Sequence, residues 1–422
     1  MVEIRFIEEH ELADFTVADA RGFGMTVPDD QQADAANRLR LTGALDQTMA
    51  AFDGGQMVAT FSSYPLEIMV PGSRHIPVAG TTWVSVHTTH RRQGILRKMM
   101  TRHLQQAIEQ GKTAAALWAS QEAIYRRYGY GWATQFQRLA FDARRVAQRP
   151  ELIADGAEIH LRMVDRDQLV TAAPPIYDAT LGRVPGALAR SGTWWRTGIL
   201  YDAPEFRRDR GELRGIVARV PSREHPAHHR DVGYVIVRQK PAWDDRSVAQ
   251  GTTNIVELAA ENDQVRRRLW HAVTGFELQP KVVYEMAPID EPLGYEVAEP
   301  RSITRNPCDG LWLRLLDVNH ALSQRRYGAE GRILIEVEDR FLNRGGRFEL
   351  DVVDGQGHCR AADSAAAPDV EVSIADLGSL YLGACTATQL QRAGGVRGSA
   401  ENIALLHRLF ATRQAPYCPE TF

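Results

Sequence analysis

The first 145 residues switch repeatedly between the apolar period of a strand and that of a helix. A period of two predicts strands, and a period of 3.6 predicts amphipathic helices. The pattern predicts a mixed α/β region with strands at 2–8, 77–86 and 113–120, a hairpin over 50–70, and helices at 10–21 and within 92–111. Turn residues support these limits, because Asp53-Gly54-Gly55 is typical of a hairpin turn and Gly111 of a helix C-cap.

The region from about 150 to 290 repeats this order of elements. It predicts a hairpin, a strand and a helix, at 212–220 with 232–240, at 253–260 and at 263–275. When the stretch 84–96 is aligned with 256–268, the strand pattern is kept at a constant offset of 172, the difference between 256 and 84. We therefore expect a second copy of the first architecture.

The residues from about 310 onward follow an α+β order, with two strands before three helices: 332–340, 347–353, 375–383, 386–392 and 400–412. A chain of 422 residues is too long for one hydrophobic core. The proline-containing segment 289–302 has the composition of a boundary. We expect three domains, spanning residues 1–147, 148–295 and 296–422.

Composition and charge argue against several classes of protein. The formal net charge is −3 and the basic residues are spread along the chain, so we expect neither a nucleic-acid nor a membrane partner. No apolar run approaches the ~20 residues that span a bilayer. The acidic N-terminus lacks the order of a signal peptide, which predicts a cytoplasmic protein.

Cysteine and histidine spacing gives little support for a metal site. The four cysteines, at 308, 359, 385 and 418, form no Cys-x-x-Cys pair, so we expect buried free thiols. Three histidines gather in 222–230 without a nearby acidic or cysteine pattern. We interpret that segment as a solvated loop and expect no metal.

The stretch 84-VSVHTTHRRQGIL-96 joins a predicted strand to a predicted helix. A helix N-terminus presents unpaired N–H groups and a positive dipole end, and Gly94 lets the backbone curl around a bulky anion. Arg91 and Arg92 add positive charge, which predicts a pyrophosphate site. The backbone of Val84 and Val86 can pair with an extended amide-containing arm of the same ligand. The alternative is a surface arginine pair before an ordinary helix.

This stretch resembles the acyl-coenzyme A signature of the GNAT N-acetyltransferases, Arg/Gln-x-x-Gly-x-Gly/Ala, with Leu96 in place of the final small residue. The block 119-ASQEAIYRRYGYGWAT-134 resembles the segment that closes the GNAT site. The resemblance implies contacts with acetyl-CoA from Val84, Ser85, Val86, Arg91, Arg92, Gln93, Gly94, Ile95, Leu96, Arg97, Ser120 and Gln121.

The whole chain resembles the Eis (enhanced intracellular survival) family, including 310-GLWLRLLDV-318, 378-GSLYLGA-384 and the C-terminal phenylalanine. That resemblance implies two tandem GNAT-like domains, the second degenerate, and a sterol-carrier-like α+β domain. It also implies acetyl transfer from acetyl-CoA to primary amines, such as aminoglycoside-type amines and lysine side chains, and a homohexamer. The other function class is a lipid or small-molecule carrier with a vestigial acetyltransferase domain.

The second copy lacks the features of the anion site. At the offset of 172, Asp263 and Gln264 stand where Arg91 and Arg92 stand, and Arg266 replaces Gly94. A carboxylate repels pyrophosphate, and a bulky residue restricts the turn. We therefore expect coenzyme binding in the first copy alone.

Acetyl transfer from a thioester to an amine benefits from an acid that protonates the departing thiolate. A tyrosine hydroxyl suits this role, and three compete: Tyr125, Tyr128 and Tyr130. Tyr128 and Tyr130 flank Gly129 and lead into the next strand, where an aromatic side chain is more often a packing residue. The family's general-acid tyrosine matches Tyr125. Ser120 has no Ser-His-Asp order around it, so we do not expect a nucleophile there.

The resemblance assigns the base to the terminal α-carboxylate, here that of Phe422. A frayed terminus is the ordinary expectation for a chain end, but 416-PYCPETF-422 is apolar and aromatic, which suits a tail held in a pocket. Acceptor amines imply an acidic wall, for which the candidates are Asp29, Asp30 and Glu420.

Overall fold

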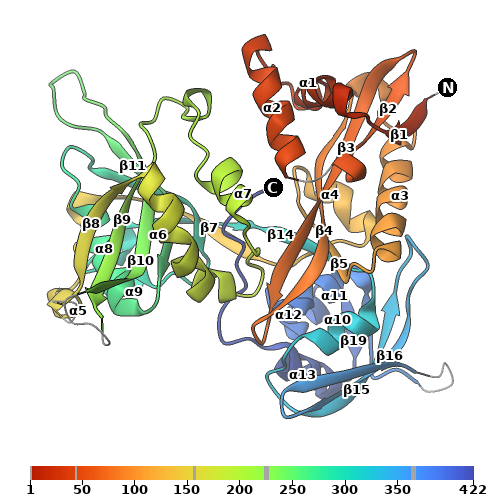
Figure 1. The fold of residues 1–422 in the computed structure, drawn as a ribbon. Coiled ribbons are helices and arrows are strands. Elements are labelled where there is room, and N and C mark those ends of the chain that lie inside the picture. The colour runs from red at the N-terminus through yellow and green to blue at the C-terminus, as the bar shows by residue number, and fades with distance from the viewer. Residues whose placement is uncertain (1, 43–44, 155–157, 223–227, 363–366) are drawn as a thin grey trace. The chain divides into compact units, whose positions relative to one another are not determined.

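The computed structural model describes residues 2–42, 45–154, 158–222, 228–362 and 367–422 (Figure 1). The chain forms two compact units. The first unit holds Met1–Thr134, Gly310–Pro416 and Thr421–Phe422, and the second holds Gln135–Asp309 and Tyr417–Glu420. The boundaries at 147 and 295 stay predictions, and His225 of the histidine cluster lies outside the described residues.

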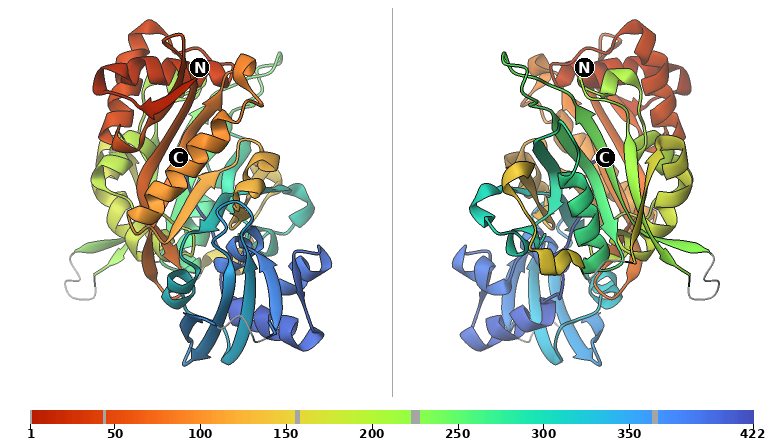
Figure 2. Two further views of the ribbon diagram at one scale, coloured as in Figure 1. Left: turned by 90° about the vertical axis from the view of Figure 1, so that its right-hand side faces the viewer. Right: turned by 90° about the vertical axis from the view of Figure 1, so that its left-hand side faces the viewer.

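The first sheet has seven strands and belongs to the first unit. Their order is β1 (Glu3–Phe6), β2 (Met49–Asp53), β3 (Gln56–Val70), β4 (Arg74–Val86), β5 (Ala114–Trp118), β14 (Leu311–Leu315) and β6 (Gly131–Trp132). The helices around it are α1 (Leu12–Gly22), α2 (Asp29–Leu41), α3 (Ile95–Glu109) and α4 (Glu122–Tyr125). In Figure 2, α3, in orange, runs along one face of this sheet.

The second sheet repeats the first and belongs to the second unit. Its order is β8 (His160–Asp165), β9 (Arg214–Pro221), β10 (His229–Lys240), β11 (Thr252–Ala260), β12 (Lys281–Pro288), β7 (Gln135–Asp142) and β13 (Thr304–Asp309). Its helices are α5 (Pro150–Ala154), α6 (Arg166–Ala179), α7 (Gly192–Trp194), α8 (Asp263–Thr274) and α9 (Leu293–Glu296). The predicted internal repeat is confirmed, because β10, β11 and β12 pair with one another as β3, β4 and β5 do.

The third sheet lies in the C-terminal part of the first unit. Its order is β17 (Gln356–Ala361), β16 (Gly346–Val353), β15 (Gly331–Glu338), β18 (Val370–Ser373) and β19 (Val396–Gly398). Four helices accompany it: α10 (Val318–Gln324), α11 (Ile374–Tyr381), α12 (Ala387–Arg392) and α13 (Ala400–Phe410). The strands and helices predicted for this region are confirmed to within a few residues.

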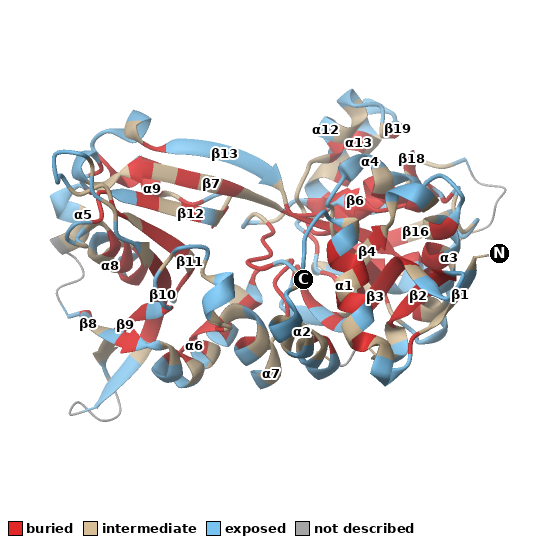
Figure 3. Ribbon diagram, turned by 90° about the horizontal axis from the view of Figure 1, so that it is seen from above, coloured by how far each residue is buried: buried red, intermediate tan, exposed pale blue. Residues whose placement is uncertain are grey.

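Two strands belong to sheets that are distant from them in sequence. β14 lies between β5 and β6, and all five of its residues are buried, as an apolar run in a central strand requires. β7 pairs with β12 in the second sheet, although the sequence boundary placed it in the first domain. Its other neighbour, β13, is an exposed edge strand that contains Pro307, which suits an edge position (Figure 3).

Among the helices that the sequence did not predict, α2 and α6 are the longest in the described residues. α2 is mostly polar and buries only Leu39, so its apolar period is weak. α6 contains Pro174 and Pro175, which are signals against a helix, yet a capping box between Asp165 and Gln168 starts it.

The thiol prediction was only partly correct. Cys418 is buried as expected, but Cys308 is exposed, and Cys359 and Cys385 are half-buried. Among the helices of the described residues, none combines the length and the apolar character that crossing a bilayer requires.

Candidate functional site

Strands β4 and β5 separate at the centre of the first sheet. They pair in parallel from Val78 with Ala114 to Thr81 with Leu117. Beyond Thr81, the pairs described for β4 are with β3 alone, and the register shifts there between Thr60 and Ser62. Trp83 lies in this irregularity at a φ of 50°, which a non-glycine residue rarely adopts. Residues 84–86 pair with no strand on the side that faces away from β3, where an extended ligand can bind if it displaces the 3.3 Å contact of Arg91 Nε with the Val86 carbonyl.

The segment His87–Gly94 connects β4 to α3 and has the geometry of an anion site. Gly94 is the N-cap of α3 at a φ of 78°, and a Cβ at this position would meet no atom of the protein within 4 Å. Arg91, Arg92 and Gln93 are exposed, and the first turn of α3 carries no acidic residue. These features fit a pyrophosphate at the helix N-terminus.

The remaining residues predicted to contact the coenzyme differ in exposure. Ile95 is buried in the core of the first sheet, so its side chain serves packing. Leu96 is half-buried. Arg97 is exposed, with its guanidinium 5.6 Å from the centre of the Phe341 ring. Ser120 and Gln121 are exposed just after β5, beyond the point of strand separation.

The three tyrosines have different surroundings. Tyr130 is fully buried, and its hydroxyl lies 3.0 Å from Thr81 Oγ1 and 3.8 Å from Met100 Sδ. Tyr128 packs edge-on against Phe341, with ring centres 4.9 Å apart. Tyr125 ends α4, and its hydroxyl hydrogen-bonds the Ser120 side chain at the strand end. The hydroxyl of Tyr125 is thus the one directed to the open end of β5.

Burial keeps Tyr125 protonated at neutral pH. Desolvation raises the pKa of its phenol above the ordinary value of 10, and the hydrogen bond with Ser120 counteracts part of this rise. A phenol that retains its proton can donate it to a departing thiolate. The electrostatics therefore suit a general acid at this position.

The C-terminal part of the first unit supports the tyrosine segment. The buried Arg314 of β14 donates to the Tyr128 carbonyl at 2.6 Å and to Asp339 at 2.5 Å. Helix α11 packs against β14 and β6 through glycines, since a Cβ at Gly378 would lie 2.3 Å from the Leu313 carbonyl oxygen. The motif 378-GSLYLGA-384 thus has a packing reason: glycine allows the close approach of helix and strand.

Sequence reasoning missed Asp19 on α1. It accepts a hydrogen bond from Thr60 Oγ1 at 2.8 Å, and Thr60 Oγ1 lies 2.8 Å from Ser85 Oγ. Burial raises the pKa of Asp19 to about 6. Asp19 shares α1 with a second acid, Asp14, so the local pattern did not single it out, and its partners are 41 positions or more away. The Asp19 carboxylate is thus linked through the Thr60 hydroxyl to Ser85 of β4.

The chain end contributes to the site of the first unit. A Cβ at Gly80 would lie 3.2 Å from Phe422 Cε2, so the terminal ring rests on β4. Gly80 pairs with Ala116, one position before the last parallel pair of β4 and β5. The sequence prediction of a held tail agrees with this position.

Glu420 does not have the position predicted for it. It is buried in the second unit and accepts a hydrogen bond from Arg190 Nε at 2.7 Å. An acceptor-facing carboxylate must be accessible and uncompensated, so its assignment to the acceptor wall was wrong. Asp29 and Asp30 are exposed in the first turn of α2, where their role stays a prediction.

The second copy lacks the anion loop for a different reason than the alignment implied. Only Glu261 and Asn262 separate β11 from α8. Asp263 and Gln264 therefore lie in the first turn of α8 and do not stand where Arg91 and Arg92 stand, so the offset of 172 fails beyond the strand. Arg266 is buried and paired with Glu291 and Glu296.

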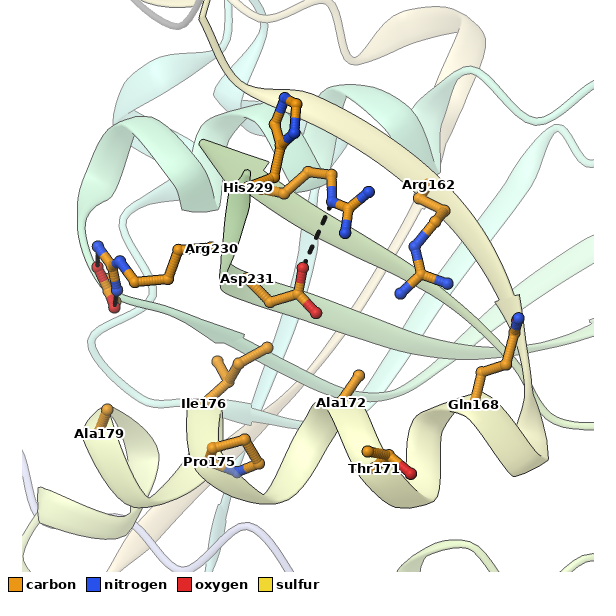
Figure 4. A pocket seen from close by; sticks show the side chains of 12 residues that line it. Arg162, Gln168, Thr171, Ala172, Pro175, Ile176, Ala179, His229, Arg230 and Asp231 are labelled. Carbon is orange, nitrogen blue, oxygen red and sulfur yellow. Dashed lines mark hydrogen bonds and ion pairs between the residues drawn. The ribbon is translucent and has the colours of Figure 1, made fainter. Parts of the chain in front are cut away.

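Another hollow, of about 630 Å³, lies in the second unit beside α6 (Figure 4). Its charged side chains are largely paired with one another, Arg230 with Glu261 and Arg219 with Asp231. In the part of the chain that the structure describes, no three His, Cys, Asp or Glu side chains are grouped to hold a metal ion.

Family models match three parts of the chain. The acetyltransferase (GNAT) domain matches residues 3–133, a second acetyltransferase (GNAT) model matches 186–315, and the sterol carrier protein domain matches 318–419. The fold is therefore α/β with two GNAT-type domains and a sterol-carrier-like C-terminal domain.

Curated relatives and solved structures match most or all of the chain. N-acetyltransferase Eis of Mycobacterium tuberculosis is 32% identical over 378 residues, 87% of this chain and 86% of that protein. An uncharacterised N-acetyltransferase of Streptomyces avermitilis is 30% identical over 434 aligned positions, 100% of this chain and 99% of that protein. The crystal structure of Eis1 from Mycobacterium abscessus has a TM-score of 0.80 at 31% identity and covers both chains fully. The chain is thus an acetyl-transferring enzyme that belongs to the Eis family of GNAT N-acetyltransferases.

Proposed function

We propose that this enzyme moves acetyl from acetyl-CoA directly to primary amines of cationic acceptors, such as aminoglycoside-type amines and lysine side chains. The main support for this proposal is the separation of β4 and β5, with the Gly94 loop at the end of β4 and Tyr125 just beyond the end of β5. Coenzyme arm, reactive thioester and acceptor amine then meet along one gap in the sheet. The homohexamer stays a prediction.

The chain's own groups divide the chemistry. Arg91 and Arg92 balance phosphate charge, and the backbone N–H groups of Gly94 and the first turn of α3 point at the same anion. The edge of residues 84–86 that faces away from β3 holds the amide-containing arm and directs the thioester toward Tyr125. The Tyr125 hydroxyl gives its proton to the leaving sulfur. The Phe422 carboxylate attracts the ammonium group and accepts its proton, directly or through a water molecule.

A carrier function has less support. One pocket at the C-terminal domain is lined by arginines and carboxylates, among them Arg126, Glu338 and Asp376, and this lining does not suit an acyl chain. Helix α11 of the C-terminal domain also packs closely against β14 and β6 of the first sheet, so this domain is a structural part of the first unit.

The proposed function is tested by thiol release. Acetyl-CoA is incubated with the enzyme and a panel of polyamines, aminoglycosides and lysine peptides, and free thiol and acetylated amine are measured together. We expect equal amounts of both products with cationic primary amines and neither with their N-acetylated forms. Binding of a fluorescent fatty acid without any thiol release would favour the carrier.

Arg92→Ala is expected to raise the KM for acetyl-CoA about tenfold with kcat little changed. A charge-assisted hydrogen bond contributes about 1.5–3 kcal/mol, and a phosphate contact is present in both ground and transition states. Gly94→Val should be worse, because a β-branched residue opposes the φ of 78°. Steady-state kinetics check both.

The control for these variants is Arg246→Ala, an exposed arginine of the second unit. Arg266→Ala is unsuitable, because it leaves Glu291 and Glu296 buried without their partner. An equal rise in KM from Arg246→Ala would contradict a coenzyme site in the first copy alone.

A further inference from the structure

A buried ion cluster in the second unit involves the C-terminal tail. Arg190, whose side chain is fully buried, donates to both carboxylate oxygens of Glu257, at 3.0 and 2.6 Å, and to Glu420 at 2.7 Å. Its guanidinium carbon lies 3.8 Å from the Tyr177 ring centre and 4.5 Å from that of Trp195. One cation is thus shared by two carboxylates and lies close to two aromatic rings that contact each other.

Further contacts hold residues 417–420, here called the tail segment. The Tyr417 N–H donates to the Pro185 carbonyl at 2.8 Å, and its hydroxyl donates to the Met286 carbonyl. The Trp194 indole N–H donates to the second oxygen of Glu420. All four residues of the tail segment are buried. This degree of enclosure is unusual so close to a chain end.

The ion cluster that holds the tail segment includes Glu257 of β11. In the first copy, the equivalent position belongs to β4 at the proposed coenzyme site. In β4, Ser85 is the residue that resumes pairing after the irregularity, opposite Thr60. In β11, Glu257 resumes pairing after the equivalent irregularity, opposite Ile236. The difference between 257 and 85 is 172, the offset of the repeat. The equivalent position in the second copy therefore anchors a peptide of the same chain.

We propose that the second GNAT-like domain is a receptor for the chain's own tail, and that Arg190, through Glu420, is the positioning residue for the Phe422 carboxylate. Only Thr421 separates Glu420 from Phe422, so fixing Glu420 confines the terminal α-carbon to within about 7 Å of that of Glu420. The proposal rests on the proposed function, in which this carboxylate works in acetyl transfer. The degenerate domain has a ligand, although it has no coenzyme loop.

The charges of the cluster decide which variant tests this proposal. Arg190→Ala leaves Glu257 and Glu420 as uncompensated buried carboxylates, which threatens folding. Glu420→Ala leaves the bidentate ion pair of Arg190 with Glu257 intact and electrically neutral. The informative variant is therefore Glu420→Ala, with Glu420→Gln as the isosteric neutral version. Glu205→Ala, an exposed glutamate of the same unit, is the control.

The first measurement does not depend on activity. Carboxypeptidase removes Phe422 and Thr421 from the intact protein, and mass spectrometry follows the release. Release tracks the population of undocked tail when docking is fast compared with cleavage. We expect Glu420→Ala to accelerate release at least about tenfold, Glu420→Gln to be intermediate, and Glu205→Ala to match the wild type. Release at the wild-type rate from Glu420→Ala would overturn the proposal.

The second measurement separates this proposal from the proposed function. Glu420→Ala should lower kcat about 10- to 100-fold, because a displacement of about 1 Å can cost about 10²-fold. The KM for acetyl-CoA and the thermal midpoint should stay near wild type, which a general structural role would not allow. Faster release with unchanged kcat would leave the tail receptor standing and overturn the catalytic use of the carboxylate.

Discussion

Tyr125→Phe is expected to lower kcat by about 10²–10⁴-fold, the usual contribution of general acid catalysis, while the KM for acetyl-CoA changes little. The substitution removes one hydroxyl that is hydrogen-bonded to Ser120 and leaves the buried ring in place. Stopped-time acetylation at saturating acetyl-CoA measures kcat, and titration of acetyl-CoA measures KM. The loss should appear in the chemical step and not in folding.

The neighbouring tyrosines provide matched controls for this prediction. Tyr130→Phe removes the hydrogen bond with Thr81 and should cost about 1 kcal/mol of unfolding free energy with kcat within a few-fold of wild type. Tyr128→Phe removes a hydroxyl from a ring that packs against Phe341 and should have little effect. A large loss of kcat from Tyr128→Phe, with none from Tyr125→Phe, would reverse the assignment.

The pH dependence of kcat tests independently whether Tyr125 is the general acid. Burial raises the pKa of Tyr125 above the ordinary 10, so the phenol is protonated and competent throughout the neutral range. Activity that depends on this proton is lost only as pH rises through the raised pKa. We therefore expect no alkaline decline in kcat below about pH 10, and Tyr125→Phe should abolish the decline above it.

Adding one glycine after Phe422 is expected to reduce the initial rate about 10²-fold or more. The extra residue moves the negative charge by up to ~3.5 Å and adds atoms to a chain end whose ring rests on β4 at Gly80. A misplacement of about 1 Å can already cost about 10²-fold. Rates at saturating acetyl-CoA are compared for the untagged protein, an N-terminally tagged form and the extended form, with matched circular dichroism.

Phe422→Ala distinguishes the carboxylate from the ring. It keeps the charge but loses the contact of the ring with β4 at Gly80, so an intermediate rate is expected. Full activity of the extended form would remove the terminal carboxylate from the mechanism. Asp19 would then be the candidate base, because its pKa of about 6 leaves it ionised at neutral pH, and Asp19→Asn should abolish activity.

Parts of the site could be predicted from the sequence because they depend on residues within a few positions. The end of β4, the glycine with positive φ and the apolar period of α3 follow one another within 84–109. Glycine, strand and helix preferences act locally, so the sequence alone predicted the loop that precedes α3. The internal repeat could be predicted for the same reason, since the strand pattern recurs at a fixed offset.

Other features depend on partners far along the chain, and local patterns carry no information about them. Glu420 is paired with Arg190, 230 positions away, and Asp19 is hydrogen-bonded to Thr60, 41 positions away. The offset of 172 failed beyond β11 because an alignment without gaps cannot represent a shorter loop.

Local sequence patterns were enough to predict a strand–glycine–helix turn suited to an anion, an internal repeat of that architecture and a tyrosine cluster that follows it along the chain. Long-range packing placed β14 in the first sheet and β7 in the second, and it joined the hydroxyl of Tyr130, but not that of Tyr125, to Thr81. It also decided that the second copy holds the tail segment. Burial is the physical reason, because an apolar strand or a charged side chain settles where the fold removes it from water together with a partner.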